Sequence, residues 1–340
     1  MNILLTGYTG NLGPSIAAAL GGHRIIVPVR NPAAAPHLPN VTVVAGDLQH
    51  LPEFFTGEVE MIVHGAAQTG FTLPLEELRA VNVAGTQSVL DYARRCRRLK
   101  RFVHVSTCFV CGAASGNIPE TPLERPARFI NGYEESKWEA ERAVLQSGLP
   151  HQSVRLSIVA GSAVDGHVRR PGALHSTLLW VYRGLIPMMP GTADSPVDII
   201  SLEFAAACVA KAVNNAQVPS PVVHAALGDR APRLGELLKH LEALFREEHR
   251  GWQSGNVSLP DIVDGETFRL FEQSAKQSGD VLFQRICQDA QTFLPGLLHP
   301  RVYAAANTPA EAACDWRELT TRVFRYLKIN HWSKPVRAAA

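Results

Sequence analysis

The sequence predicts an α/β fold in which a doubly wound parallel sheet is joined to a smaller, mostly helical C-terminal lobe. Short apolar runs alternate regularly with helical patterns over the first half of the chain, and the connections between them are short. The apolar runs carry apolar residues on both faces, which is typical of strands in a parallel sheet covered by helices on both sides. A glycine-rich turn directly follows the first strand and opens a helix. Together these observations favour a doubly wound sheet.

The expected elements follow one another without long interruptions. The apolar runs predict strands at residues 3–7, 25–29, 41–46, 61–67, 101–107 and 153–161. The helical patterns predict helices at residues 12–20, 78–94 and 132–146.

The sequence changes character after Gly161. Proline and glycine cluster at 171–172 and 187–196, on either side of an apolar stretch at 174–186. A helical segment and one further strand, at 222–227, follow, and the remainder is mostly helical. The expected division is a cofactor-binding domain at 1–161, to which 197–228 returns, and a substrate lobe at 162–196 and 229–340, laid over the open edge of the sheet.

Composition excludes several classes of protein. The 340 residues carry a net charge of +2, so the overall charge indicates neither a nucleic acid nor an acidic partner. We find no leader and no apolar span of transmembrane length, and six dispersed cysteines indicate reduced thiols, so a cytoplasmic protein is expected. Cys108 and Cys111 form a CxxC without a second ligand pair, and the 13 histidines show no ligand spacing, so no metal is expected.

A locally basic run, RRCRRLKR, spans residues 94–101. A solvated helix end before a strand is the favoured interpretation. Docking of an acidic carrier domain or of phosphates is the alternative.

The turn TGYTGNLG contains Gly7, Gly10 and Gly13 in a GxxGxxG pattern. Glycines in such a turn permit a tight bend, a close backbone approach to a pyrophosphate and close packing of helix on strand. The phosphates would bind the free N–H groups at the start of the following helix, where Pro14 is tolerated in the first turn. A glycine turn without a ligand is the alternative for this pattern taken alone.

Tyr133 and Lys137 form a YxxxK pattern at the start of a predicted helix, four residues apart and therefore on one face. A free tyrosine titrates near ~10, so a neighbouring cation is needed for it to exchange a proton near neutrality. The strand that ends in Ser106 and Thr107 brings hydroxyl groups to the carboxyl edge of the sheet, where sites of parallel sheets form. Alternation along the strand directs Ser106 to the side opposite Thr107.

In combination, these motifs resemble the extended short-chain dehydrogenase/reductases, with a Rossmann-like fold. The resemblance covers about residues 1–161 and is carried by TGYTGNLG, GDL (46–48), HGAA (64–67), VNVAGT (81–86), VSTCFVCG (105–112) and YEESK (133–137). The phrases IVPVR, HGAAQTGF, RFVHVST and PVDII are similar to the thioester-reductase and fatty-acyl-reductase branch. Sugar-nucleotide epimerases and dehydratases are the nearest rival branch.

The resemblance implies a cofactor site for NADP(H). Its implied members are Gly7, Gly10 and Gly13 at the pyrophosphate, the backbone of Thr9, Asn11 and Leu12, Asp47 and Leu48 beside the adenine, Ala66 and Ala67 along the cofactor, Asn82 as a support of the active-site helix, and Lys137 at the ribose. Arg30 follows the second strand, where the family distinguishes its cofactors, and an arginine there favours the 2′-phosphate of NADP.

The resemblance also implies the catalytic set. Thr107 would hydrogen-bond the substrate carbonyl, Tyr133 would donate the proton, and Lys137 would hold the pKa of the phenol down. Two positions depart from the family pattern. Ser157 stands where a proline is frequent, and Cys111 stands where a tyrosine is common. Both departures leave the proton-transfer residues in place.

The function expected is an NADPH-dependent reductase that acts on a carbonyl, such as an acyl thioester on CoA or on an acyl carrier protein, or on the derived aldehyde. The apolar segment at 174–189 would form an acyl-binding wall or pack the lobe. A sugar-nucleotide epimerase or dehydratase, with Arg169 and Arg170 at a diphosphate, is one alternative, and a non-catalytic NADP-binding sensor is another. By analogy with the family, the long helices at 78–94 and 132–146 would form a homodimer.

Overall fold

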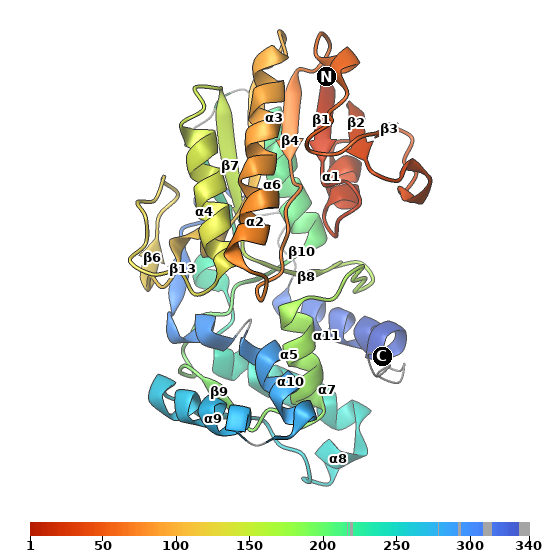
Figure 1. Ribbon diagram of the computed structural model, residues 1–340. Coiled ribbons are helices and arrows are strands. Elements are labelled where there is room, and N and C mark those ends of the chain that lie inside the picture. Colours follow the sequence, from red (N-terminus) through yellow and green to blue (C-terminus); the bar gives the residue numbers. More distant parts are fainter. Residues whose placement is uncertain (216, 218–219, 278, 292–293, 309–314, 333–340) are drawn as a thin grey trace.

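A seven-stranded parallel sheet forms the centre of the main domain (Figure 1). The structure, a computed structural model, describes residues 1–215, 217, 220–277, 279–291, 294–308 and 315–332. The strands of the sheet lie in the order β11-β7-β5-β4-β1-β2-β3, and every neighbouring pair is parallel. Their bounds are β1 (Asn2–Thr6), β2 (Arg24–Val29), β3 (Val41–Ala45), β4 (Met61–His64), β5 (Arg101–Thr107), β7 (His151–Leu156) and β11 (Val222–Ala225). The predicted doubly wound sheet is confirmed, and its order reverses between β1 and β4, where such folds bind ligands.

Helices cover both faces of this sheet (Figure 1). One layer consists of α2 (Leu75–Asn82), α3 (Ala84–Arg95) and α4 (Gly132–Leu145), and the other of α1 (Gly13–Ala19) and α6 (Leu202–Asn214). Successive residues of β1 belong to different cores, because Ile3 and Leu5 pack in one apolar cluster and Leu4 in the other. This alternation explains why the strands are apolar on both faces.

The helix expected at 78–94 is two helices, α2 and α3, which meet at Val83. The hydroxyl of Thr86 donates to the carbonyl oxygen of Asn82, 2.6 Å away. A hydroxyl that bonds the carbonyl four residues earlier competes with the backbone ladder and bends a helix. The prediction of a single helix at 78–94 was therefore wrong at this point.

The strand expected at 153–161 is also two strands, β7 and β8 (Ile158–Gly161), separated by Ser157. The amide of Ser157 still donates to Ala225 of β11, whereas the amide of Ile158 donates to Asp198. The chain therefore leaves the main sheet after Leu156, and β8 pairs instead with β10 (Ile199–Ser201).

A second lobe lies beyond the carboxyl ends of the main strands (Figure 1). Its helices are α5 (Ala173–Tyr182), α7 (Leu234–Glu248), α8 (Arg250–Gln253), α9 (Gly265–Gln277), α10 (Val281–Gln291) and α11 (Trp316–Leu327). The expected placement over an open edge holds for one segment, because Thr308 Oγ1 donates to the carbonyl oxygen of His224 in the outer strand β11 at 2.8 Å, whereas the helices of the lobe lie beyond the carboxyl ends. Because β8 leaves the main sheet, the chain that follows it continues beyond the carboxyl ends of the main strands. The division at 161, 196 and 228 stays a prediction.

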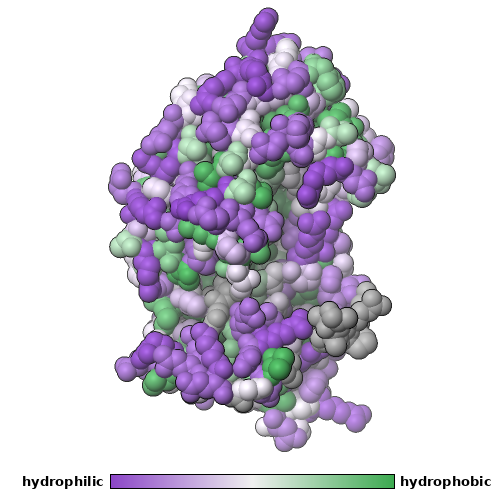
Figure 2. Space-filling model, viewed as in Figure 1, coloured by the Kyte–Doolittle hydropathy of each residue, from purple (hydrophilic) through white to green (hydrophobic). Residues whose placement is uncertain are grey.

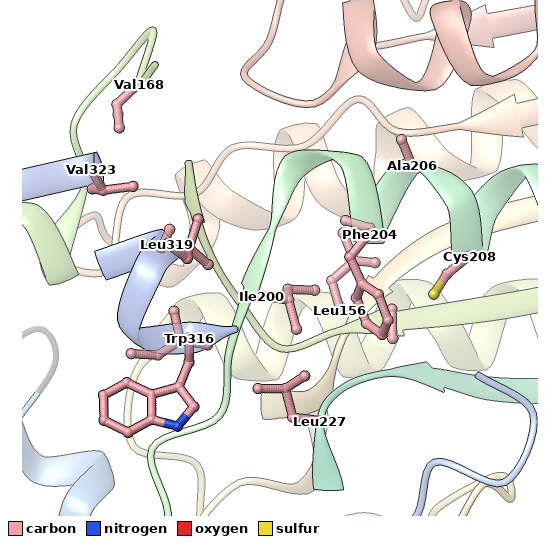
Figure 3. Packing of buried hydrophobic residues seen from close by; sticks show 14 of the residues in the cluster. Leu156, Val168, Ile200, Phe204, Ala206, Cys208, Leu227, Trp316, Leu319 and Val323 are labelled. Atoms are coloured by element: carbon pink, nitrogen blue, oxygen red, sulfur yellow. The ribbon is translucent and has the colours of Figure 1, made fainter. Parts of the chain in front are cut away.

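Three short parallel pairings tie distant segments together. They are β8 with β10, β9 (Met188–Pro190) with β12 (Asp261–Val263), and β6 (Gly116–Ile118) with β13 (Arg301–Tyr303). Figure 3 shows Leu319 and Val323 of α11 in the same apolar cluster as Ile200 of β10 and Phe204 of α6. The lobe and the main domain therefore share one core.

The basic run at 94–101 is a helix end followed by a strand. Arg94 and Arg95 form ion pairs with Asp91 and Glu53, at 2.5 and 2.6 Å. Arg101 is buried and donates to the carbonyl oxygens of Ala212 and Asn215. These internal partners favour the helix-end interpretation over docking of an acidic carrier.

Hydrophilic side chains cover most of the face shown in Figure 2, and hydrophobic ones are scattered among them. In the part of the chain that the structure describes, no helix combines the length and the apolar character needed to cross a bilayer.

Candidate active site

The glycine turn between β1 and α1 has the geometry of a phosphate cradle. Gly7 has φ +79°, and a Cβ there would lie 2.6 Å from the amide nitrogen of Ala66. A Cβ on Gly13 would collide with the backbone of Tyr8. A Cβ on Gly10 would meet a single backbone atom, Gly7 O at 3.1 Å, and would otherwise extend into open space. The first and third glycines therefore pack the turn, and the second keeps its outer side clear for a ligand.

The side chain of Asn11 joins this turn to the loop that precedes α5. Its Nδ2 donates to the carbonyl oxygen of Arg170, and its Oδ1 accepts from the amide of Arg170, both at 2.9 Å. The same loop brings Arg169 close enough to Tyr8 to lower the pKa of its phenol, although burial raises that pKa overall. Arg169 and Arg170 thus lie at the glycine turn.

The residues expected around the adenosine lie after β2 and β3. Arg30 is exposed and directly follows β2. The Oδ1 of Asp47 accepts from the amides of Gln49 and His50, and these hydrogen bonds, with that of His50 first, lower the pKa of the carboxyl. Asp47 therefore shapes the turn after β3 through its side chain. Leu48 packs on α3, where a Cβ on Gly85 would lie 2.6 Å from its Cδ1.

The segment after β4 borders both the glycine turn and the catalytic helix. The amide of Ala66 donates to Thr6 Oγ1 at 3.3 Å, and Ala67 is half-buried beside it. Asn82 exchanges two hydrogen bonds with the backbone of Gln68 and donates to Ser136 Oγ of α4 at 2.9 Å. Asn82 therefore ties the segment after β4 to the helix that carries Tyr133 and Lys137.

The end of β5 carries two hydroxyls on opposite sides, as alternation predicts. Ser106 Oγ donates to Glu141 Oε2 at 2.7 Å. Thr107 Oγ1 caps the 3₁₀ turn at Cys108–Cys111 by accepting from Phe109 N at 3.3 Å. It also hydrogen-bonds the phenol of Tyr133, an interaction that lowers the pKa of that phenol.

Tyr133 lies in the first turn of α4, and its ring stands edge-on to Phe71 with ring centroids 5.2 Å apart. Burial outweighs the hydrogen bond with Thr107 and raises the pKa of Tyr133 to about 12. The expectation that Lys137 lowers this pKa stays a prediction. The phenol keeps its proton across the neutral range, as a proton donor must.

Lys137 lies four residues after Tyr133 on α4 and is 3% exposed. Its Nζ donates to the carbonyl oxygen of Val105 at 3.0 Å and lies 3.4 Å from His104 Nε2. Burial lowers the pKa of Lys137 to about 8, and the charge of Glu141 opposes that change. The ammonium is therefore directed toward β5 and titrates close to neutrality.

The start of α4 is capped from both sides. Asn131 accepts from the amide of Glu134 at 3.0 Å, and Glu134 Oε2 accepts from the amide of Ile130 at 2.9 Å. This reciprocal pattern resembles a capping box and fixes the first turn, which carries Tyr133. Glu134 is 2% exposed, and burial raises its pKa to about 7.

Cys108 and Cys111 are buried, and burial raises the pKa of both thiols. Arg301 of β13 lies 3.6 Å from Cys111 Sγ and holds its guanidinium over the ring of Phe109. Burial and the raised pKa values favour a packing role for these thiols.

Several polar residues near the site were not foreseen from the sequence. His64 and His104 are buried in β4 and β5 behind Lys137. Arg155 of β7, with no exposed surface, forms a buried ion pair with Glu141, which also accepts from Ser106. Alternation places His104 on the same strand face as Ser106, a signal that the apolar character of the strand concealed.

The glycine turn at the carboxyl edge of a doubly wound sheet, with threonine, tyrosine and lysine beside it, defines an extended short-chain dehydrogenase/reductase. The sequence model of the NAD-binding family described as male sterility protein matches residues 28–209, more than half of the chain. The protein therefore belongs to that family, in the branch that contains the thioester reductases, and its cofactor is a nicotinamide dinucleotide.

Curated relatives include the NRPS-like oxidoreductase fscA of Fusarium equiseti, 27% identical over 85% of this chain and 31% of its own length. The alcohol-forming fatty acyl-CoA reductase of Simmondsia chinensis is 37% identical over 24% of this chain and 18% of its own length. The chain thus spans less than a third of these two relatives.

Among solved structures, the terminal R domain from the myxalamid PKS-NRPS pathway matches with a TM-score of 0.76 at 21% identity, over 96% of this chain and 90% of that domain. UDP-glucuronic acid 4-epimerase from Bacillus cereus matches with a TM-score of 0.67 at 15% identity, over 99% of both chains. At such identities the two likenesses establish the fold alone.

Proposed function

We propose that the protein is an NADPH-dependent reductase of acyl thioesters, carried on CoA or on an acyl carrier protein, or of the aldehydes derived from them. The main support is the arrangement of Thr107, Tyr133 and Lys137 at the carboxyl edge of the sheet, next to the glycine turn. A non-catalytic sensor needs the turn but has no use for a protonated phenol beside a hydroxyl. The names of the curated relatives, which are fatty acyl-CoA and NRPS-type reductases, support thioesters as the substrate class.

The cofactor fits the residues that surround the turn. Gly10 leaves the outer side of the turn clear for a pyrophosphate, and Arg30 offers an exposed guanidinium after β2. A guanidinium binds a phosphate through charge-assisted hydrogen bonds, so Arg30 favours NADP over NAD. The bound dinucleotide would supply a hydride to the substrate carbonyl.

The side chains supply the remaining chemistry. Thr107 Oγ1 donates a hydrogen bond to the carbonyl oxygen, and Tyr133 Oη donates its proton to that oxygen as negative charge develops there. Lys137 stabilises the resulting phenolate by its charge and binds the ribose. The tetrahedral product of a thioester then releases its thiol and leaves an aldehyde. Asn82 keeps α4, and with it Tyr133 and Lys137, in register with the segment after β4.

The acyl-binding role expected of the apolar segment at 174–189 stays a prediction, because the apolar cavity that part of it lines in the second lobe has room for about one water molecule. The wall of this cavity includes Leu185 to Met188, within the segment expected to contact an acyl chain or to pack the lobe, together with Phe268 and Phe271 of α9. A carrier protein as the donor of the acyl group and a homodimer remain predictions.

The test combines NADPH with acyl-CoA thioesters, acyl-pantetheine thioesters and the matching aldehydes. NADPH oxidation, thiol release and product identity are followed together, with Tyr133→Phe as the control variant. We expect thiol release and aldehyde or alcohol formation, and we expect Tyr133→Phe to bind NADPH normally while its turnover falls about 10²- to 10⁴-fold. Turnover of aldehydes alone would restrict the function to carbonyl reduction. Inactivity toward the whole panel, or unchanged turnover of Tyr133→Phe, would contradict the proposal.

A further inference from the structure

Two fully buried histidines lie behind the catalytic helix, in the middle of the main sheet. His64 of β4 is 1% exposed and His104 of β5 has no exposed surface, and their ring centroids are 5.6 Å apart. Burial lowers the pKa of His64 to about 3 and that of His104 well below its ordinary value, so both rings are neutral. A neutral imidazole has one nitrogen that donates and one that accepts. The contacts of each ring decide which is which.

His64 has a partner on each ring nitrogen. Its Nε2 lies 2.9 Å from Thr86 Oγ1, and the proton of that hydroxyl is already donated to Asn82 O. His64 Nε2 must therefore be the donor. Its Nδ1 then accepts from Thr6 Oγ1, 2.8 Å away. Both nitrogens are satisfied, so His64 links β1, β4 and α3 as a structural residue.

His104 differs, because only one of its nitrogens has a partner. Its Nε2 lies 3.4 Å from Lys137 Nζ, whereas its Nδ1 is buried without a hydrogen-bond partner among the described residues. An ammonium can only donate, so Nε2 must accept and the proton of the ring must reside on Nδ1. A buried N–H without a partner destabilises a fold. An apolar side chain at this position would avoid the free-energy cost of the unpaired N–H. The imidazole, unlike an apolar side chain, can accept a hydrogen bond from Lys137.

We propose that His104 is a positioning residue for Lys137, which it holds on β5 in its charged form by accepting a hydrogen bond at Nε2. The neighbouring carbonyl of Val105 provides a second acceptor at 3.0 Å. These two acceptors bind two of the three N–H groups of the ammonium, and the third is left for the ribose.

The other groups that face Lys137 do not replace His104. His64 of β4 is neutral and satisfied, and Glu141 of α4 is committed to Arg155 and Ser106. Since burial brings the pKa of Lys137 to about 8, loss of one acceptor moves its titration into the neutral range. Tyr133 would then lose the positive charge that stabilises its phenolate.

The experiment measures the titration of Lys137 directly. The chain has seven lysines, so NMR of protein labelled with ¹³C at the lysine ε-carbon resolves few signals, and Lys137→Arg assigns the one of interest. His104→Phe removes the acceptor. His104→Gln places an amide oxygen near the position of Nε2, whereas the shorter side chain of His104→Asn reaches only the position of Nδ1. His240→Phe, which removes a half-buried histidine bonded to Thr321 in the second lobe, is the control.

We expect the pKa of Lys137 to fall by about one unit in His104→Phe and His104→Asn, to be restored in His104→Gln, and to be unchanged in His240→Phe. The alkaline limb of the kcat profile should move by the same amount, with KM little affected. An unchanged pKa of Lys137 in folded His104→Phe would overturn the proposal. If His104→Phe does not fold, equal pKa values in His104→Asn and His104→Gln would overturn it.

Because this role of His104 rests on the proposed function of Lys137, the two must be separable. The NMR titration requires no substrate. A failure of thioester reduction would therefore leave the titration result intact, and a failure of the titration would leave the reductase assay intact.

Discussion

Glu134 makes the stability of the catalytic helix depend on pH. Its carboxyl is 2% exposed, and burial raises its pKa from 4.5 to about 7, against the hydrogen bond from Ile130 and the charge of Arg301. The folded state therefore binds a proton that the unfolded state has released. The resulting stability is fully present below the unfolded pKa and is lost as the pH rises through about 7. The difference corresponds to about 3 kcal/mol of unfolding free energy.

The perturbation is Glu134→Gln, which keeps the shape and the acceptor for Ile130 but cannot ionise. Unfolding free energies of the variant and of the wild type are measured by denaturant titration at about pH 5, 6, 7 and 8. We expect the variant to gain about 2.5 kcal/mol relative to the wild type between the lowest and the highest pH, because pH 5 already lies above the unfolded pKa. Glu77→Gln, an exposed carboxylate in the first turn of α2, is the control and should run parallel to the wild type. A constant difference between Glu134→Gln and the wild type over the whole range would refute the reasoning.

Three further changes test other parts of the site. Arg30→Asp should raise the Kd for NADPH at least about tenfold with little effect on NADH, measured by fluorescence titration; equal weakening would show that Arg30 does not bind the 2′-phosphate. Gly10→Ala should weaken both cofactors because its Cβ enters the space above the turn, whereas Gly22→Ala, with nothing within 4 Å, should bind normally. Normal binding by Gly10→Ala would place the pyrophosphate elsewhere. Arg155→Leu leaves Glu141 buried without its ion pair and should cost about 3–5 kcal/mol of stability by thermal and denaturant unfolding. A loss below about 1 kcal/mol would mean that Glu141 finds another partner or takes up a proton.

The main sheet could be predicted from the sequence because its signals are local. Apolar runs bounded by turns identify the strands, and the glycine turn and the YxxxK motif each span only a few consecutive residues. The residue types at the site follow from the same local motifs. Their roles were assigned by resemblance to a family.

The errors in secondary structure arose where the deciding contact is distant or subtle. The break after Leu156 depends on Asp198 and Ala225, which receive successive amides of the chain. The break between α2 and α3 coincides with the hydrogen bond from the hydroxyl of Thr86 to Asn82 O, and threonine within a helical pattern does not by itself predict a break.

The electrostatics of the site could not be predicted because burial is a tertiary property. The sequence gives Tyr133 and Lys137 on one helix face, and the expectation was that the ammonium would lower the pKa of the phenol. The structure shows that the ammonium contacts Val105 and His104 of β5, which the spacing along one helix does not reveal. The contact of Asn11 with Arg170, 159 residues apart, was unpredictable for the same reason.

The parallel pairings that join the lobe to the main domain have a consequence for synthesis on the ribosome. Strand β6 has no pairing partner until β13 has been synthesised, and the surface of β8 and β10 is not covered until α11 has been synthesised. Both therefore stay exposed until residues 301–327 have emerged. Contacts between segments so far apart in sequence slow folding, and unpaired strand edges attract other chains in the meantime. We therefore expect the nascent protein to need chaperones more than a compact domain of local contacts does, and its yield on expression to depend on the rate and temperature of synthesis.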